Sequence, residues 1–219
     1  MVQIRDSHFT APDGNRYFRR NASALGIGKW GEKKQPLTQA NYLEVVGNVR
    51  YSLLEGKIRK STPYVIDWSR ESRADVEASA TVYYTVDGTA AFSQSRAKEA
   101  ALTVIRFHVE GGDLTRTLND ADVVRDGMKR EGSDARICSS IWVVMSGELA
   151  ERFATSVELG VSASASNGLS VSVSGGGTWQ GEERITLSES AVFAYGLHKI
   201  ESWKGDLVGT VEDDWQSLG

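Results

Sequence analysis

The sequence has one cysteine, three histidines, three prolines and no long apolar run in its 219 residues. The single Cys138 excludes an internal disulfide, so a reducing, cytoplasmic compartment is the simplest expectation. A membrane-spanning helix needs about 18 consecutive apolar residues, and no such run occurs. Residues 1–15 also lack the apolar segment of a secretory signal. We therefore expect a cytoplasmic protein without a transmembrane helix.

Residues suited to catalysis are equally scarce. The three histidines are widely separated and show no metal-ligand spacing: His8, His108 and His198. Residues 26–31 spell G-x-G-x-x-G, but no strand precedes them and Pro36 interrupts any following helix, which argues against a dinucleotide site. Cys138 lies in the apolar run 137–146, which favours a structural role. We expect no catalytic site, no metal and no cofactor, and hence a protein that is not an enzyme.

Charge is unevenly distributed along the chain. Residues 1–60 carry a net +6 and residues 61–219 a net −10. The basic part interleaves cations with Tyr17, Phe18 and Trp30, and its candidate lipid-binding residues are Arg16, Arg19, Arg20, Lys29, Lys33 and Lys34. Such a region binds anionic lipid or nucleic acid, or is simply a solvated basic face. The last fifteen residues, 205–219, are acidic and contain no basic residue.

The segment 155–177 alternates apolar residues with serine and glycine, which is typical of β-strands. Asn167 and Gly168 provide a turn between two arms. A three-residue loop over 166–168 would pair Ala165 with Leu169, so that apolar residues face apolar residues and serines face serines. Each arm is about as long as a transmembrane β-strand, which needs about 9–11 residues. A hairpin in a soluble sheet, with one face in water, explains the same pattern.

The remaining pattern predicts an α+β fold dominated by antiparallel strands. We expect helix over 113–131 in two pieces, the second capped by Asn119 or Asp120 and ended by Gly132. Residues 1–40 are expected to be loop with short elements, and 41–60 fit helix or strand. The predicted strands are 76–86, 89–95, 100–109, 137–146, 153–166, 169–174, 183–188 and 191–200.

The order of these elements resembles the pore-forming domain of the gasdermins, particularly the short bacterial members. The resemblance covers about residues 75–200, and the similar stretches are 102–119, 122–145, 155–175 and 185–200. Its clearest part is the closing strand, with Val192, Phe193, Ala194, Tyr195 and Leu197. The chain departs from the family in having no cysteine near residue 1 and no evident basic first helix.

The resemblance implies a long twisted antiparallel sheet with two extended hairpins, about 76–109 and 139–175, and a few short helices packed on it. Residues 1–204 would form the pore-forming domain and 205–219 a short, candidate inhibitory tail. Copies of the chain would assemble on the inner face of the cell membrane and insert their hairpins, causing regulated cell death or antiphage defence.

The resemblance also assigns roles to residues. One face of the second hairpin would meet lipid through Val157, Leu159, Val161, Ala163, Ala165, Leu169, Val171 and Val173. Trp215 and Leu218 would dock the tail. The expected partners are anionic lipids, further copies of the chain and an activating protease, without nucleic acid. The alternative is a soluble β-rich structural or interaction subunit, and a further rival is a nucleic-acid binder whose binding depends strongly on salt.

Overall fold

The computed structural model describes residues 3–4, 7–66, 84–86, 89–90, 102–145, 158–163, 169–174, 182–187 and 192–214. Its helices are α2 (Gly111–Asn119) and α3 (Asp122–Glu131), with 3₁₀ turns η1 (Ala22–Ala24), η2 (Tyr51–Leu53) and η4 (Gly132–Asp134). Its strands are β1 (Gln3–Ile4), β2 (His8–Thr10), β3 (Arg16–Phe18), β4 (Lys29–Lys34), β5 (Tyr42–Asn48), β6 (Ile58–Lys60), β7 (Tyr64–Ile66), β8 (Tyr84–Val86), β9 (Thr89–Ala90), β10 (Leu102–Val109), β11 (Ala135–Met145), β12 (Glu158–Ala163), β13 (Leu169–Ser174), β14 (Glu182–Leu187), β15 (Val192–Lys204) and β16 (Leu207–Asp213).

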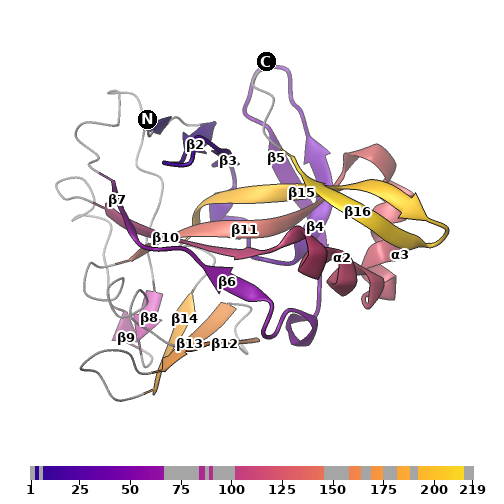
Figure 1. Ribbon diagram of the computed structural model, residues 1–219. Helices are drawn as coiled ribbons and strands as arrows, with labels where there is room; N and C mark the ends of the chain where they lie inside the picture. Colours follow the sequence, from indigo (N-terminus) through magenta and orange to yellow (C-terminus); the bar gives the residue numbers. More distant parts are fainter. Residues whose placement is uncertain are drawn as a thin grey trace.

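The strands form two antiparallel sheets. The larger has eleven strands in the order β1-β2-β3-β15-β11-β10-β6, with β7 also on β10, β16 on β15, and β4 joining β11 to β5. The smaller has five strands in the order β12-β13-β14-β8-β9 and lies below β10 and β11 in Figure 1. The predicted antiparallel sheet with few helices is confirmed at this level. No helix in the described part of the chain is long and apolar enough to cross a membrane.

The centre of the larger sheet is built from apolar runs that the sequence marks clearly. The strands predicted over 100–109, 137–146 and 191–200 correspond to β10, β11 and β15. Residues 41–60, which fit either helix or strand, contain β5, η2 and β6. β-Branched and aromatic residues fit the pleated surface of a sheet, and their frequency in these segments favours strands.

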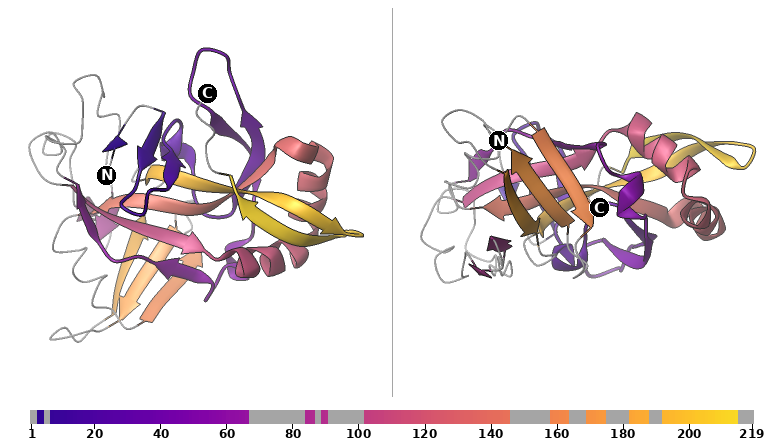
Figure 2. Two further views of the ribbon diagram at one scale, coloured as in Figure 1. Left: turned by 45° about the horizontal axis from the view of Figure 1, so that its top comes forward. Right: turned by 90° about the horizontal axis from the view of Figure 1, so that it is seen from below.

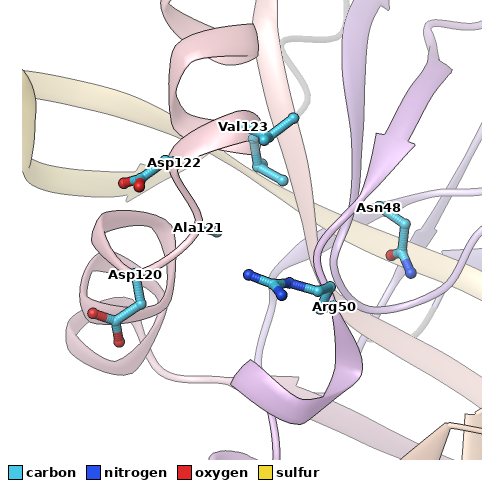
Figure 3. A pocket seen from close by; sticks show the side chains of 7 residues that line it. Asn48, Arg50, Asp120, Ala121, Asp122 and Val123 are labelled. Carbon is cyan, nitrogen blue, oxygen red and sulfur yellow. The ribbon is translucent and has the colours of Figure 1, made fainter.

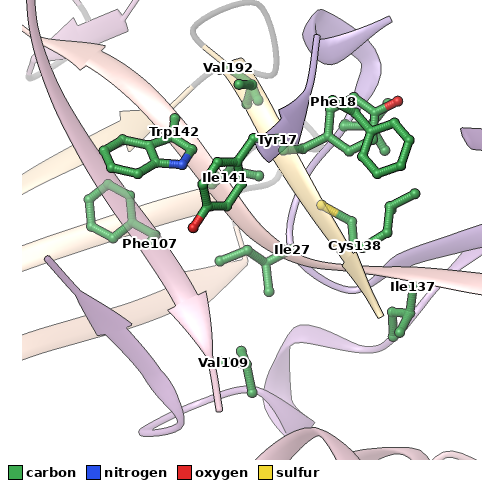
Figure 4. Close-up of a cluster of buried hydrophobic side chains, with 14 of the residues drawn as sticks. Tyr17, Phe18, Ile27, Phe107, Val109, Ile137, Cys138, Ile141, Trp142 and Val192 are labelled. Atoms are coloured by element: carbon green, nitrogen blue, oxygen red, sulfur yellow. The ribbon is translucent and has the colours of Figure 1, made fainter. Parts of the chain in front are cut away.

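An aromatic cluster fixes the N-terminal strands on the sheet (Figure 4). Phe9 meets Trp142 edge-on at 5.2 Å between ring centres and Phe193 at 5.4 Å. Tyr17 meets Trp142 at 5.4 Å. Edge-to-face packing adds about 0.5–1.5 kcal/mol per pair beyond the buried area. Residues 8–18, expected to be mainly loop, therefore contribute to the core.

The helical region consists of two helices, as predicted, and Gly132 ends α3 with a φ of 69°. The predicted cap is wrong. Ala121 precedes α3 without a side-chain cap, and Asn119 is the last residue of α2. The Asn119 side chain instead donates to the Val208 carbonyl at 3.1 Å and accepts from the Val208 N–H at 2.8 Å. Asn119 thereby joins α2 to β16.

The predicted boundary between a domain 1–204 and a tail 205–219 falls inside a β-hairpin. Strand β15 continues to Lys204, the chain turns at Gly205 with a φ of 64°, and β16 returns along β15. Val208 in β16 is 3% exposed. Residues 205–213 are therefore part of the larger sheet rather than a separate tail.

Candidate functional site

Four neighbouring strands of the larger sheet frame the candidate site. They lie in the order β7-β10-β11-β15, and each pairs antiparallel with the next. A single end of this group contains the pairs Ile66 with Leu102, Thr103 with Met145, and Val143 with Val192. The chain leaves the larger sheet at this end after β7 and again after β11, and each time it returns to the adjacent strand.

These two departures are long insertions. The first insertion, residues 67–101, connects β7 to β10 and holds 35 residues. The second insertion, residues 146–191, connects β11 to β15 and holds 46 residues. Connections between neighbouring elements in compact domains have a median of about 4–6 residues, and these two are far longer than a connection alone requires. The insertions are therefore the candidate functional segments.

The described strands of the two insertions pair with one another. Strands β8 and β9 come from the first insertion and β12, β13 and β14 from the second, and β14 pairs with β8 through Thr186 and Thr85. Figure 2 shows these strands on one side of the larger sheet in both of its views. In this state each insertion supplies strand partners to the other.

In the hairpin of the second insertion, apolar residues are opposite apolar residues and serines opposite serines, as predicted. The predicted three-residue loop is wrong. Ala163 pairs with Leu169, Val161 with Val171 and Leu159 with Val173, whereas the prediction paired Ala165 with Leu169. Five residues, 164–168, separate the paired ends. A slip of two residues keeps apolar opposite apolar, so alternation alone does not distinguish the two registers. Val157 and Ala165 lie outside the described residues.

The six predicted lipid-binding residues do not form one exposed basic patch. Lys33 is 6% exposed, and its ammonium donates to the Asp214 carboxylate at 2.8 Å. Arg136 donates to the same carboxylate at 2.7 Å. Lys33 also lies 5.4 Å from the centre of the Phe18 ring. This buried group ties β4 and β11 to the residue that follows β16.

Most of the other basic side chains also make contacts within the protein. Arg19 is 9% exposed and stacks over Phe193 at 4.6 Å, and Arg20 donates to the Ala40 carbonyl. Lys29 donates to the Ala24 carbonyl at 2.7 Å. Lys34 donates to Glu32 and Glu44, and these hydrogen bonds raise its pKa. Arg16 is exposed at the start of β3. Most of the predicted lipid-binding cations are therefore engaged in contacts within the protein and do not form a basic surface that is free to bind lipid.

The predicted tail anchors, Trp215 and Leu218, lie outside the described residues. The chain is described up to Asp214, whose backbone N–H donates to the Leu197 carbonyl at 2.8 Å. The C-terminal end of the described chain is thus fixed to β15 by its backbone and to Lys33 and Arg136 by its side chain.

Cys138 is completely buried in β11 and its thiol lies 3.5 Å from the Ser140 carbonyl. Burial raises the pKa of the thiol to about 12, so the reactive thiolate does not form near neutral pH. Among the residues that the structure describes, no group of histidine, cysteine and carboxylate side chains is placed to hold a metal ion.

A cavity of about 370 Å³ lies beside the start of α3 (Figure 3). The Arg50 side chain extends into the space between β5 and the turn that carries Asp120 and Asp122. The residues that line the cavity are Asn48, Arg50, Asp120, Ala121, Asp122, Val123 and Val124. Neither the predicted lipid-binding residues nor those of the second insertion line this cavity.

Comparison with known proteins gives no relative: no family model, no curated protein and no solved structure matches this chain. Nothing in these comparisons identifies a gasdermin family.

Proposed function

We propose that this protein forms membrane pores by extending its two insertions as β-hairpins from the frame β7-β10-β11-β15. The observation that carries the proposal is the placement of both insertions at one end of four adjacent antiparallel strands. Extending each insertion along its flanking strands would continue the same four-stranded ladder. No crossing of strands and no change of neighbours in the frame would be required.

The insertions are long enough for this. A hairpin made from the first insertion would have arms of about 17 residues, and one made from the second about 23, whereas a membrane-spanning strand needs about 9–11. If the pairing of Val143 with Val192 were continued along the second insertion, its midpoint would fall at residues 167–168, which are Asn and Gly. Asn and Gly favour a turn at this midpoint.

The second insertion also has the chemistry that a membrane strand needs. Its apolar residues share one parity of the register, including Val161 opposite Val171, and serines share the other, including Ser162 opposite Ser170. Lipid would meet the first set and water the second. Continuing the Val143–Val192 register with this parity requires a one-residue bulge, and bulges already occur between β11 and β15.

A single copy would leave two open strand edges, which lipid does not tolerate. Pairing with neighbouring copies would satisfy these edges, so the proposal includes a homo-oligomer on an anionic membrane. The described state, in which β14 pairs with β8, would be the resting form. That pairing would have to open before either insertion could extend. The proposed setting is regulated cell death or antiphage defence, with an activating protease as one possible trigger.

Dye release from vesicles containing anionic lipid tests the proposal. Val171→Lys would place a charge on the lipid side at a cost of about 2–4 kcal/mol near the midplane, and we expect it to abolish release. Ser172→Lys, one position along the same strand, is the matched control and should release dye nearly as well as the parent. Equal effects of the two substitutions would show that Val171 does not face lipid while Ser172 faces water. Specific oligomers without any release, for the full chain and for chains cut after residue 204, would favour a soluble assembly subunit instead.

A further inference from the structure

His198 lies where four elements meet. On β15 it is paired with Ile137 of β11 on one side and Asp213 of β16 on the other. The first residue of α2 covers the ring, because a β-carbon added at Gly111 would stand 3.9 Å from Nε2. The side chain is 11% exposed. A change in the charge of the His198 ring therefore alters its electrostatic interaction with both α2 and β16.

The hydrogen bonds of His198 fix which nitrogen carries the proton. Its Nδ1 lies 2.7 Å from the Ser139 hydroxyl and 3.4 Å from an Asp213 oxygen. The pairing of β11 with β15 skips Ser139, whose hydroxyl donates to the Gly196 carbonyl at 3.4 Å. With the hydroxyl donating to Gly196, its oxygen accepts a hydrogen bond from the ring; we therefore assign the proton to Nδ1, which leaves Nε2 for an additional proton.

A proton on Nε2 would be unfavourable in the folded protein. Burial of the ring lowers the pKa of His198, and the carboxylates of Asp213 and Glu110 only partly oppose this. The nitrogen faces the N-terminal end of α2, where the helix dipole is positive and disfavours a cation. From β11 the ring meets the Ser139 hydroxyl, which adds no charge.

His108 is a second titrating group at the same turn. Its Nε2 lies 2.9 Å from Glu110, the residue that precedes α2, and its Nδ1 is buried without a hydrogen-bond partner. Burial lowers the pKa of His108 first of all. The cations Arg106 and Arg59 act in the same direction and Glu110 acts against them.

We propose that His198, assisted by His108, makes the junction of α2, β15 and β16 sensitive to mild acid. Above pH 7 both rings are neutral and the junction is closed. As the pH falls below about 6.5, the ordinary value in an open or unfolded chain, protons bind the open form more tightly than the closed form. Acid therefore opens the junction, and the effect is complete once the pH has passed below the lowered pKa of the folded state. This inference does not depend on pore formation.

Hydrogen exchange at pH 7.5 and 5.5 tests the proposal, with rates corrected for the intrinsic effect of pH. We expect amides of β16 and α2 to open more often at pH 5.5, by up to about 10-fold for each unit that separates the folded and unfolded pKa values of His198. Amides in the middle of β10 and β11 should change less. His198→Gln should remove most of this pH dependence, and His108→Gln a smaller part.

His8 provides the matched control, because this third histidine lies in β2, outside the junction. His8→Gln should keep the full pH dependence of β16. Equal pH dependence in the parent and in His198→Gln would overturn the proposal, as would its loss in His108→Gln alone. Should His198→Gln fold poorly, the histidine titration of the parent chain by NMR decides: a His198 midpoint below 6.5 supports the proposal, and one at or above 6.5 overturns it.

Discussion

The Lys33 ammonium and the Asp214 carboxylate, 181 positions apart in the sequence, form an ion pair at 2.8 Å with side chains only 4% and 10% exposed. Arg136 completes the group from β11 at 2.7 Å. Lys33 and Asp214 thereby join the basic N-terminal part of the chain to the end of β16. Two buried cations share one carboxylate, so the acid is the member that the group depends on most.

Asp214→Asn should destabilise the protein strongly, because it leaves two buried cations without a counter-charge. Breaking a buried pair in this way costs about 3–5 kcal/mol. Urea unfolding at pH 7 measures the loss. Asp206→Asn is the control, since Asp206 pairs with Lys129 but is 92% exposed, and it should change the free energy of unfolding little. Similar losses for both substitutions would show that burial of the Asp214 group contributes little.

Asn119→Ala should loosen β16 from α2. The substitution removes two hydrogen bonds to the backbone of Val208, and we expect a loss of about 1–3 kcal/mol in the free energy of unfolding. Protection of the Val208 amide against hydrogen exchange should fall as well. Asn15→Ala, which removes a hydrogen bond to Asp13 in the turn between β2 and β3, should leave the protection of the Val208 amide unchanged.

Two glycine-to-alanine substitutions in helices should have opposite signs. Gly112→Ala in α2 adds a methyl group that meets only the Arg116 side chain, at an ordinary contact distance of 4.0 Å, and should stabilise by about 0.5–1 kcal/mol through helix propensity. Gly127→Ala in α3 places the methyl group inside the Trp30 ring and should destabilise by about 1–3 kcal/mol. Thermal unfolding of the pair distinguishes the two effects, and a stabilising Gly127→Ala would contradict the packing of α3 on Trp30.

A disulfide between β8 and β14 should block the proposed formation of pores. Thr85 and Thr186 are register partners in antiparallel strands, whose Cα separation of about 4.5–5.5 Å suits a disulfide. Thr85→Cys with Thr186→Cys, oxidised, should release no dye from anionic vesicles, and a reductant should restore release. The single substitutions should behave as the parent. Undiminished release by the oxidised pair would show that β8 and β14 need not separate.

The sequence predicts the elements of this protein better than their long-range contacts. Strands β10, β11 and β15 and the two helices follow from apolar periodicity and from Gly132, which are local signals. The burial of Lys33 has no local signal, because its partner Asp214 is distant in the chain. The acidic composition of 205–219 similarly conceals β16, although Val208 and Val211 would mark a short strand.

The candidate site shows the same division. Alternation in 155–177 predicts which residues of β12 and β13 share a face, but not the register between the strands, since registers two residues apart have equal polarity. The frame β7-β10-β11-β15 depends on which strands are neighbours, and this is a property of the folded sheet. No motif in the sequence specifies it.

The pairing of β14 with β8 also affects how the chain folds during its synthesis. β8 can pair with β14 only after Thr186 has been synthesised, 101 positions after its partner Thr85. At a synthesis rate of about 5–20 residues per second, the delay is roughly 5–20 s. Throughout this time the edge of β8 that β14 will cover has no native partner, and such an edge is open to pairing with other chains. The nascent chain is therefore most vulnerable to misassembly between the emergence of its first insertion and that of its second.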